Sequence, residues 1–315
     1  MDKIIAAIVA AIIALITALF GGSGSGGGSE TPVTTSPSNV PTTVTTTVPL
    51  KDYDTVSNYV YGADANRQSY NLYIPKDARG TVGLILYVHG GFWTIGDKSE
   101  FDAQAREAAG RGYIGATMNY RYVSIDTHLE SLLDDISSAL QSIKNVAGMR
   151  GINVEKVILC GWSAGAHLAL MYGYTRAGSA PVKPVAVWEM SGPTDLSDDM
   201  WLDGGDALMN VFTCLTGGMI TQSNFHNNIA QAVLKQDSPL YHISSSTVPT
   251  IISQGRKDKT VPYANGEKLY QALFMNNVKV AAFAYPNSDH GLESDPAVAE
   301  QAKATLYSWA KTYMG

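Results

Sequence analysis

Residues 156–173 read KVILCGWSAGAHLALMYG, and this stretch decides both the fold class and where a functional site is expected. It begins as a short apolar run, passes through Gly161-Trp162-Ser163-Ala164-Gly165 and continues as a helical pattern. A serine in so tight a turn between strand and helix has a strained backbone, and its hydroxyl stands above the sheet. The following helix directs N–H groups toward developing negative charge. The pattern predicts a nucleophilic serine rather than a capping serine in a glycine-rich turn.

A serine hydroxyl is a poor nucleophile at neutral pH and requires a base within hydrogen-bond reach. Of the six histidines, His290 is favoured because it lies in AYPNSDHGL, a loop after the last predicted strand. His167 lies one turn into the helix of the serine itself, and His89 ends an earlier strand. The others, which follow no predicted strand, are His128, His226 and His242. We predict that His290 is the base and that His89 braces its own loop by hydrogen bonding.

The base in turn requires a carboxylate that orients it, and two aspartates compete for this role. Asp258 follows the apolar strand VPTIIS, from where its side chain can reach the ring of His290. Asp195 follows the preceding strand in MSGPTDL, where a helix cap or a turn residue is an ordinary alternative. We predict Asp258 as the acid, with Asp195 as its rival, and Asp289 as a carboxylate that stabilises its loop. The order Ser163, Asp258, His290 is the order found in α/β-hydrolases.

Acyl transfer also needs preorganised backbone N–H groups that stabilise the oxyanion of the tetrahedral intermediate. In LILYVHGGFWTIGDKS a predicted strand ends at His89, and the glycines that follow let the backbone turn its N–H groups toward the serine. We expect an oxyanion hole made of the N–H groups of Gly91, Phe92 and Ala164. Phe92 and Trp93 are candidates for the acyl pocket, although ordinary packing beside a sheet explains aromatic residues there equally well.

From about residue 51 onward, short apolar runs alternate with longer helical patterns, which is typical of βαβ units in a largely parallel sheet. Strands are predicted near Tyr70–Ile74, Val82–Val88, Gly115–Asn119, Lys156–Cys160, Pro184–Glu189, Thr250–Ser253 and Val278–Tyr285. Helices are predicted over Phe101–Arg111, Leu129–Val146, Ala164–Tyr174, Asn265–Met275 and Ala297–Tyr313. Between Leu196 and about Thr247 this alternation of strand and helix patterns is absent. The expected fold class is α/β, with a mostly parallel central sheet flanked by helices and an insertion near the active site.

The first 50 residues differ in composition from the rest. Residues 4–20 are apolar apart from Thr17, which predicts an export signal, and the small residues at 21–25 permit cleavage. At about 1.5 Å per residue the stretch barely crosses a bilayer, so an uncleaved anchor over residues 1–20 is the alternative. Residues 21–50 are rich in Gly, Ser, Thr and Pro and predict a disordered linker. We expect a catalytic domain over residues 51–315 in a secreted or surface-tethered protein, which contacts membrane only through such an anchor.

Composition argues against several other classes of function. The formal net charge of −6 comes with no basic stripe, so neither nucleic acid nor an anionic membrane surface is an expected partner. The sequence has two cysteines, Cys160 and Cys214, which is too few for a disulfide scaffold, and they lack zinc-ligand spacing. We expect two free thiols and no metal. The oligomeric state is left open by the sequence.

With these residues identified, the chain resembles the hormone-sensitive-lipase-like esterases and, more closely, the BD-FAE-type carbohydrate esterases, which are related to feruloyl and acetylxylan esterases. The blocks that carry the resemblance are HGGFWTIGDKS, NYRY, GWSAGAHLA, SGPTDL, DKTVP and SDHGL. They follow the family's order within about residues 65–312. The resemblance implies an α/β-hydrolase fold, no cofactor, and hydrolysis of a small-molecule or polysaccharide-linked short acyl ester by Ser163, Asp258 and His290.

The chain departs from the family pattern in two places. Phe92 stands where the lipase-like group often has a third glycine, which fits the carbohydrate esterases but narrows the acyl space. Within residues 196–247 only SPLYHIS resembles the family, so substrate contacts are not carried over to that segment. A peptidase, an acyltransferase and a non-catalytic surface binding module on the same fold remain alternatives, and the natural ester is left open.

Overall fold

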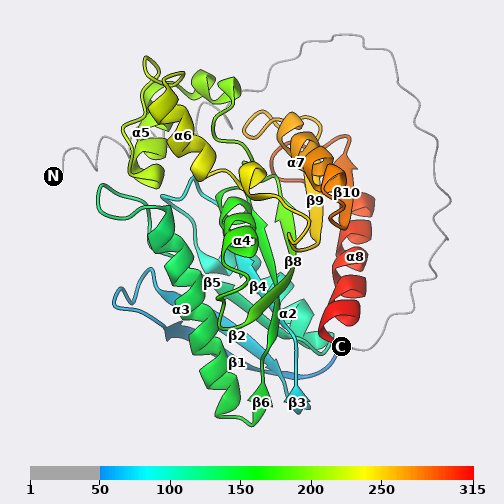
Figure 1. Ribbon diagram of the computed structural model, residues 1–315. Coiled ribbons are helices and arrows are strands. Elements are labelled where there is room, and N and C mark those ends of the chain that lie inside the picture. Colours follow the sequence, from blue (N-terminus) through cyan, green and yellow to red (C-terminus); the bar gives the residue numbers. More distant parts are fainter. Residues whose placement is uncertain (1–49) are drawn as a thin grey trace.

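An eight-stranded sheet, in the order β1-β2-β5-β4-β7-β8-β9-β10, forms the centre of the computed structural model, which describes residues 50–315 (Figure 1). The strands are β1 (Tyr53–Val60), β2 (Ser69–Pro75), β4 (Leu84–Val88), β5 (Ile114–Met118), β7 (Lys156–Trp162), β8 (Lys183–Met190), β9 (Thr250–Gly255) and β10 (Val280–Tyr285). From β5 to β10 in sheet order the neighbours are parallel, whereas β2 is antiparallel to both β1 and β5. The prediction of a mostly parallel sheet is confirmed. The predicted leader (1–20) and the predicted linker up to residue 49 lie outside the described residues.

The central strands are buried along most of their length because helices cover both of their faces. Every residue of β4 is buried, and so is every residue of β5 and β9. All seven predicted strands are present, with ends that differ by at most two residues. Strand β1 was not predicted, because its sequence YDTVSNYV is polar and mostly exposed at the sheet's edge. A two-stranded sheet of two residues per strand, β3 (Gly80–Thr81) and β6 (Ile152–Asn153), was not predicted either.

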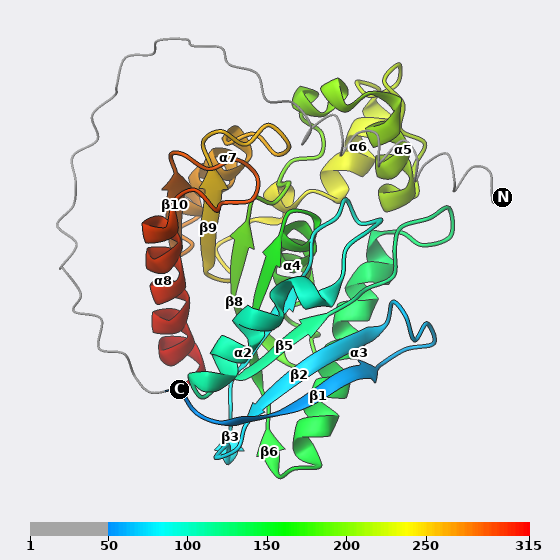
Figure 2. The same ribbon diagram turned by 180° about the vertical axis from the view of Figure 1, so that it is seen from behind.

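Two helical layers enclose the sheet. The helices of these layers are α2 (Asp102–Gly110), α3 (Leu129–Gly148), α4 (Ala164–Thr175), α7 (Ala264–Met275) and α8 (Pro296–Met314). Side chains of α3, α4 and α7 join the core on one face of the sheet (Figure 1), and those of α2 and α8 join the core on the other (Figure 2). All five predicted helices are present within two residues of their predicted ends. The first ten residues of α4 are buried on all sides, which places this helix in the interior of the fold.

Residues 196–247, where the alternation of strands and helices is interrupted, form the predicted insertion. It contains α5 (Gly205–Thr216) and α6 (Asn228–Gln236), with 3-10 helices at Asp199–Gly204 and Pro239–His242. In Figure 1 the two α-helices lie at the top of the molecule, beyond the end of the sheet at which α4 begins. Phe212 and Leu215 of α5 are buried within the main core, so the insertion packs firmly against the rest of the chain.

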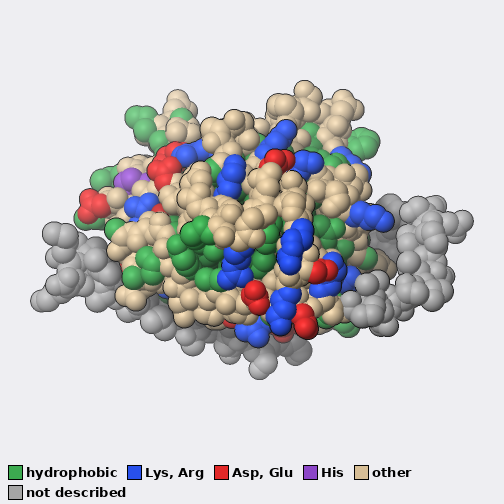
Figure 3. Space-filling model, turned by 90° about the horizontal axis from the view of Figure 1, so that it is seen from below, with side chains coloured by type: hydrophobic (Ala, Val, Ile, Leu, Met, Phe, Trp, Pro, Cys, Tyr) green, Lys and Arg blue, Asp and Glu red, His purple; other side chains and the backbone are tan. Residues whose placement is uncertain are grey.

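The opposite end of the sheet is rich in positive charge. Figure 3 shows this face from below, with Lys and Arg side chains more numerous than Asp and Glu. Lys156 and Lys183 begin β7 and β8 and are register partners, although like charges in such positions repel. These cations come from separate elements, which is why the sequence showed no basic stripe. Within residues 50–315 no helix combines the length and the apolar character needed to cross a bilayer.

Candidate active site

Ser163 occupies the sharp turn that joins β7 to α4. Its backbone angles are φ 54° and ψ −122°, a conformation that L-residues rarely adopt, as expected for a strained strand-to-helix turn. A Cβ on Gly161 would lie 2.2 Å from the carbonyl oxygen of Gly165, and a Cβ on Gly165 would lie 2.2 Å from that of Val88. The Ser163 N–H donates to the carbonyl of Met190 at 2.8 Å. The turn therefore depends on glycine at both flanking positions.

The structure brings Ser163, His290 and Asp258 together in one hydrogen-bonded chain. His290 Nε2 lies 2.9 Å from Ser163 Oγ, and His290 Nδ1 lies 2.8 Å from Asp258 Oδ2. The three residues are 6%, 3% and 6% exposed, so little water competes for these bonds. A carboxylate only accepts hydrogen bonds, so Nδ1 carries the proton and Nε2 is free to accept from the serine hydroxyl. This arrangement can take a proton from Ser163 and stabilise the imidazolium that results.

The carboxylate of Asp258 is fixed by groups other than His290. Its Oδ1 accepts the backbone N–H groups of Thr260 and Val261 at 2.8 and 2.9 Å. Its Oδ2 also receives Gln254 Nε2 at 3.2 Å. These bonds fix the carboxylate in the position from which Oδ2 orients the imidazole ring of His290.

The rival aspartates lie in other hydrogen-bond networks. Asp195 Oδ1 accepts from the N–H and the hydroxyl of Ser197, and its Oδ2 lies 3.7 Å from the ammonium group of Lys268. Asp289 accepts the N–H of Gly291, as expected for a residue that stabilises its loop. The geometry therefore favours Asp258 over Asp195 as the partner of the histidine.

Two further histidines near the site are fully buried and serve as neutral hydrogen donors. His89 Nδ1 donates to the carbonyl of Gly90 at 2.7 Å, and its ring stacks on Tyr120 with centroids 4.4 Å apart. His167 Nε2 donates to the carbonyl of Asp237 at 2.7 Å. Burial lowers the pKa of each histidine to about 4. The bracing role predicted for His89 matches these contacts, and neither ring carries charge at neutral pH.

The loop after β4 lies beside Ser163, because Phe92 and Trp93 line the same cavity as the serine. Gly91 has φ 104° and Phe92 has φ 50°, and the Gly91 carbonyl accepts the N–H groups of Thr94 and Ile95. Among the backbone hydrogen bonds of residues 50–315, none has the N–H of Gly91, Phe92 or Ala164 as its donor. These three N–H groups are therefore available for an oxyanion, which remains a prediction for their role.

A small apolar cavity of about 10 Å³ adjoins Ser163. Its lining combines the loop after β4, the start of α4, the insertion and the turn after Asp258, in the residues Phe92, Trp93, Ser163, Ala164, Pro193, Trp201, Leu208, Phe212, Thr260 and Val261. Phe92 and Trp93 therefore line the cavity, and they also pack against the hydrophobic core. The sequence analysis did not assign Trp201, Leu208 or Phe212 to the site. Their signal was the cluster of large apolar residues in the insertion, but no spacing there indicated which of them face the serine.

Trp162, between Gly161 and Ser163, supports the loop that contains His290. Its indole Nε1 donates to the carbonyl of His290 at 2.9 Å, and the two rings lie 5.1 Å apart. The same indole borders a cleft of about 820 Å³ between α2 and α8, together with Asp289 and Leu292. This contact holds the His290 loop against the sheet, and the sequence pattern did not predict it.

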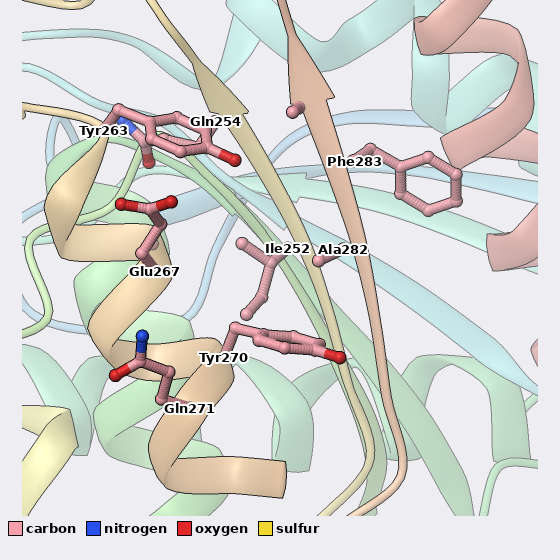
Figure 4. A pocket seen from close by; sticks show the side chains of 10 residues that line it. Ile252, Gln254, Tyr263, Glu267, Tyr270, Gln271, Ala282 and Phe283 are labelled. Atoms are coloured by element: carbon pink, nitrogen blue, oxygen red, sulfur yellow. The ribbon is translucent and has the colours of Figure 1, made fainter. Parts of the chain in front are cut away.

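A third pocket lies away from this chemistry. Figure 4 shows it between α7 on one side and strand β9 and the edge strand β10 on the other, with Tyr263, Glu267 and Tyr270 facing Ile252 and Ala282. Its volume is about 340 Å³, and its lining includes none of the residues that contact Ser163.

The described residues include no group of three or more His, Cys, Asp and Glu side chains that could hold a metal ion. Cys160 and Cys214 are buried and free, as predicted. Burial raises the pKa of both thiols, so neither is poised as a thiolate nucleophile.

Comparisons with known proteins agree with this architecture. The BD-FAE family model matches residues 70–273. A probable isoprenylcysteine alpha-carbonyl methylesterase of Oryza sativa is 27% identical over 244 residues, which are 73% of this chain and 56% of that protein. The kynurenine formamidase of Salmo salar is 24% identical and matches 75% of this chain and 74% of its own length. The chain thus spans little more than half the length of the rice relative.

Solved structures show the same fold. Esterase B from Lactobacillus rhamnosis has a TM-score of 0.66 and 22% identity, covering 84% of this chain and 88% of its own. A truncated carbohydrate esterase from gut microbiota has a TM-score of 0.60 and 18% identity, covering 81% and 99%. The predicted α/β-hydrolase fold is confirmed.

Proposed function

Because the chain belongs to the BD-FAE family, we propose that it is a serine carboxylic-ester hydrolase that acts on short acyl esters. The observation that carries this proposal is the hydrogen-bonded chain from Ser163 Oγ through His290 to Asp258, at 2.9 and 2.8 Å. An ester hydrolase needs such a base-activated hydroxyl beside backbone donors for the oxyanion. The names of the esterase relatives and structural neighbours support the same activity.

The proposed reaction proceeds in two halves. Ser163 Oγ attacks the ester carbonyl while His290 Nε2 takes the hydroxyl proton, and the tetrahedral oxyanion is held by the N–H groups of Phe92, Ala164 and Gly91. The histidine then gives its proton to the departing alcohol, which leaves an acyl-serine. Water attacks that ester with the same histidine as base, and collapse of the second intermediate releases the acid and restores the serine.

The cavity beside Ser163 favours a small acyl group. This cavity is small, at about 10 Å³, and its walls are the buried side chains of Trp93, Trp201 and Phe212. An acetyl group needs far less room than a feruloyl group. Within the range of short acyl esters, we therefore propose acetyl esters as the preferred substrates.

We further propose that the acetyl group is carried by a polysaccharide outside the cell. The family, the carbohydrate esterase among the structural neighbours and the apolar run at residues 4–20 support this substrate and location. A secreted or tethered enzyme meets polymeric esters that do not enter cells. A peptidase or an acyltransferase would use the same triad and is distinguished by its products.

The direct test is the hydrolysis of p-nitrophenyl acetate by the wild type and by Ser163→Ala. We expect turnover by the wild type and none above background by the variant, with unchanged circular dichroism. Retained turnover in the variant would disprove the assignment of the nucleophile.

A substrate panel then tests the acyl group and its carrier. It contains acetyl, butyryl and feruloyl esters, acetylated xylan, a peptide amide and an acceptor alcohol. The proposal expects release of acetate from the acetyl ester and from xylan. Cleavage of the peptide alone, transfer to the alcohol alone, or no turnover at all would favour the alternative functions.

A further inference from the structure

Glu189 is a fully buried carboxyl group at the end of β8 to which the chemistry above assigns no role. In the sheet it pairs with Gly161 of β7 on one side and Ile252 of β9 on the other. Its Oε2 accepts the N–H of Gly192 at 2.8 Å, whereas no donor in the described part of the chain reaches Oε1. A carboxyl group with a single hydrogen bond thus lies between the strand that ends in the nucleophile's turn and the strand that leads to Asp258.

The hydrogen bond to Gly192 fixes a turn that also anchors Ser163. The carbonyl of Met190, in this turn, accepts the Ser163 N–H at 2.8 Å. Ser191, the next residue, has φ 52°, and Ser163 has φ 54°. Each of these conformations costs on the order of 1–3 kcal/mol and persists only when the surroundings over-determine it. The Glu189 carboxyl supplies one of the bonds that hold the turn in place.

The surroundings of Glu189 favour its neutral form. Burial raises the pKa of Glu189 to about 8, and the negative charge of Asp258 adds to this effect against the opposing hydrogen bond from Gly192. The negative charge that opposes ionisation of Glu189 belongs to Asp258, on the turn after β9, and Glu189 in turn raises the pKa of Tyr174, on α4. Burial raises the pKa of Tyr174, so this tyrosine is neutral as well. A buried carboxylate with one hydrogen bond and no counter-charge costs far more than the neutral acid.

We propose that Glu189 is a positioning residue: as a neutral acid, its carboxyl group holds the turn at residues 190–192 that anchors Ser163 and keeps a second negative charge away from Asp258. This role rests on the proposed ester hydrolysis. When Glu189 ionises, a second buried negative charge is added to that of Asp258, and the turn must open to hydrate the new charge. Activity should then fall reversibly as the pH rises through the pKa of Glu189.

Two substitutions separate the acceptor from the charge. Glu189→Gln keeps an oxygen that can accept from Gly192 but cannot ionise, and Glu189→Met keeps the size of the side chain without the acceptor. The readout is kcat and KM on p-nitrophenyl acetate from neutral to alkaline pH, after subtraction of spontaneous hydrolysis. Rates are expressed per active site titrated with a fluorophosphonate, so that only folded enzyme is counted.

At neutral pH we expect wild-type kcat from Glu189→Gln. From Glu189→Met we expect a loss of roughly tenfold to a hundredfold in kcat with little change in KM, because the nucleophile is misplaced rather than the substrate lost. The wild type should lose kcat with a midpoint near pH 8, and Glu189→Gln should lack this decline.

Wild-type kcat in Glu189→Met would overturn the proposal, and so would a loss in Glu189→Gln as large as that in Glu189→Met. An alkaline decline that is identical in the wild type and in Glu189→Gln would overturn it too, and this comparison decides the matter if Glu189→Met does not fold. A wild type without activity on esters would instead contradict the proposed function.

Discussion

The Nδ1 atom of His290 lies 2.8 Å from Oδ2 of Asp258, while Oδ1 of the same carboxylate is held by two backbone N–H groups. The acid is thereby oriented before any substrate binds. Such preorganisation distinguishes Asp258 from Asp195, whose carboxylate is committed to Ser197 and Lys268.

Asp258→Asn should therefore lower kcat by roughly 10⁴-fold, because an amide in this position favours the wrong tautomer of the histidine. Asp195→Asn should cost only a small fraction of that loss, since His290 keeps its partner. Both rates are measured on p-nitrophenyl acetate with circular dichroism as the check on folding. A larger loss in Asp195→Asn than in Asp258→Asn would contradict the assignment of the acid.

Leu208→Ala should shift the acyl preference toward longer chains. Leu208 lines the cavity beside Ser163, and shortening it opens room for additional methylene groups, each worth about 1–3 kcal/mol in such a pocket. The ratio of kcat/KM for butyrate over acetate should rise by about tenfold or more. Ile229→Ala, an exposed position on α6 of the same insertion, is the matched control and should leave the ratio unchanged. If Leu208→Ala and Ile229→Ala gave the same butyrate-to-acetate ratio, the acyl group would not bind in the cavity that Leu208 lines.

Gly165→Ala should destabilise the protein by about 3 kcal/mol or more, because overpacking against fixed backbone leaves no room to relax. The new Cβ would lie 2.2 Å from the carbonyl oxygen of Val88 and 2.4 Å from that of His89. Gly148→Ala is the control, since nothing lies within 4 Å of its Cβ position at the end of α3. Urea denaturation measures both free energies of unfolding. Similar values for the two variants would show that the close approach around Gly165 is not required.

His167 should make stability depend on pH in a defined direction. Burial lowers its pKa from 6.5 to about 4, so between these values the unfolded chain binds a proton that the folded chain does not. Protonation of the unfolded state favours unfolding, and the contribution of this histidine to stability is therefore lost as the pH falls through that window. Relative to His167→Gln, the wild type should lose up to roughly 3 kcal/mol in its free energy of unfolding. If the difference in free energy of unfolding between the wild type and His167→Gln stayed constant as the pH falls, this prediction would be contradicted.

The three residues of the proposed triad were predictable because they follow strands. Ser163, Asp258 and His290 each lie just beyond a strand of the parallel sheet, where carboxyl ends converge, and short apolar runs reveal such strands. The seven buried strands were visible for the same reason. Strand β1 was not, because an edge strand with a mostly exposed sequence lacks the apolar signal.

The cavity beside Ser163 and the supporting contacts were not predictable. Trp201, Leu208 and Phe212 reach the cavity from an irregular insertion, where no period fixes which side chains face inward. The Trp162 bond to the His290 loop and the single hydrogen bond of Glu189 depend on tertiary packing, which no sequence spacing encodes.

The proposed function depends on Ser163 being a nucleophile that His290 activates. A fluorophosphonate probe tests it most directly, because the probe reacts covalently with an activated serine, and peptide mass spectrometry then locates the adduct. We expect one adduct per chain on the peptide that contains Ser163, with complete loss of esterase activity and no labelling of Ser163→Ala. Labelling at another residue, or esterase activity that survives full labelling of Ser163, would contradict it.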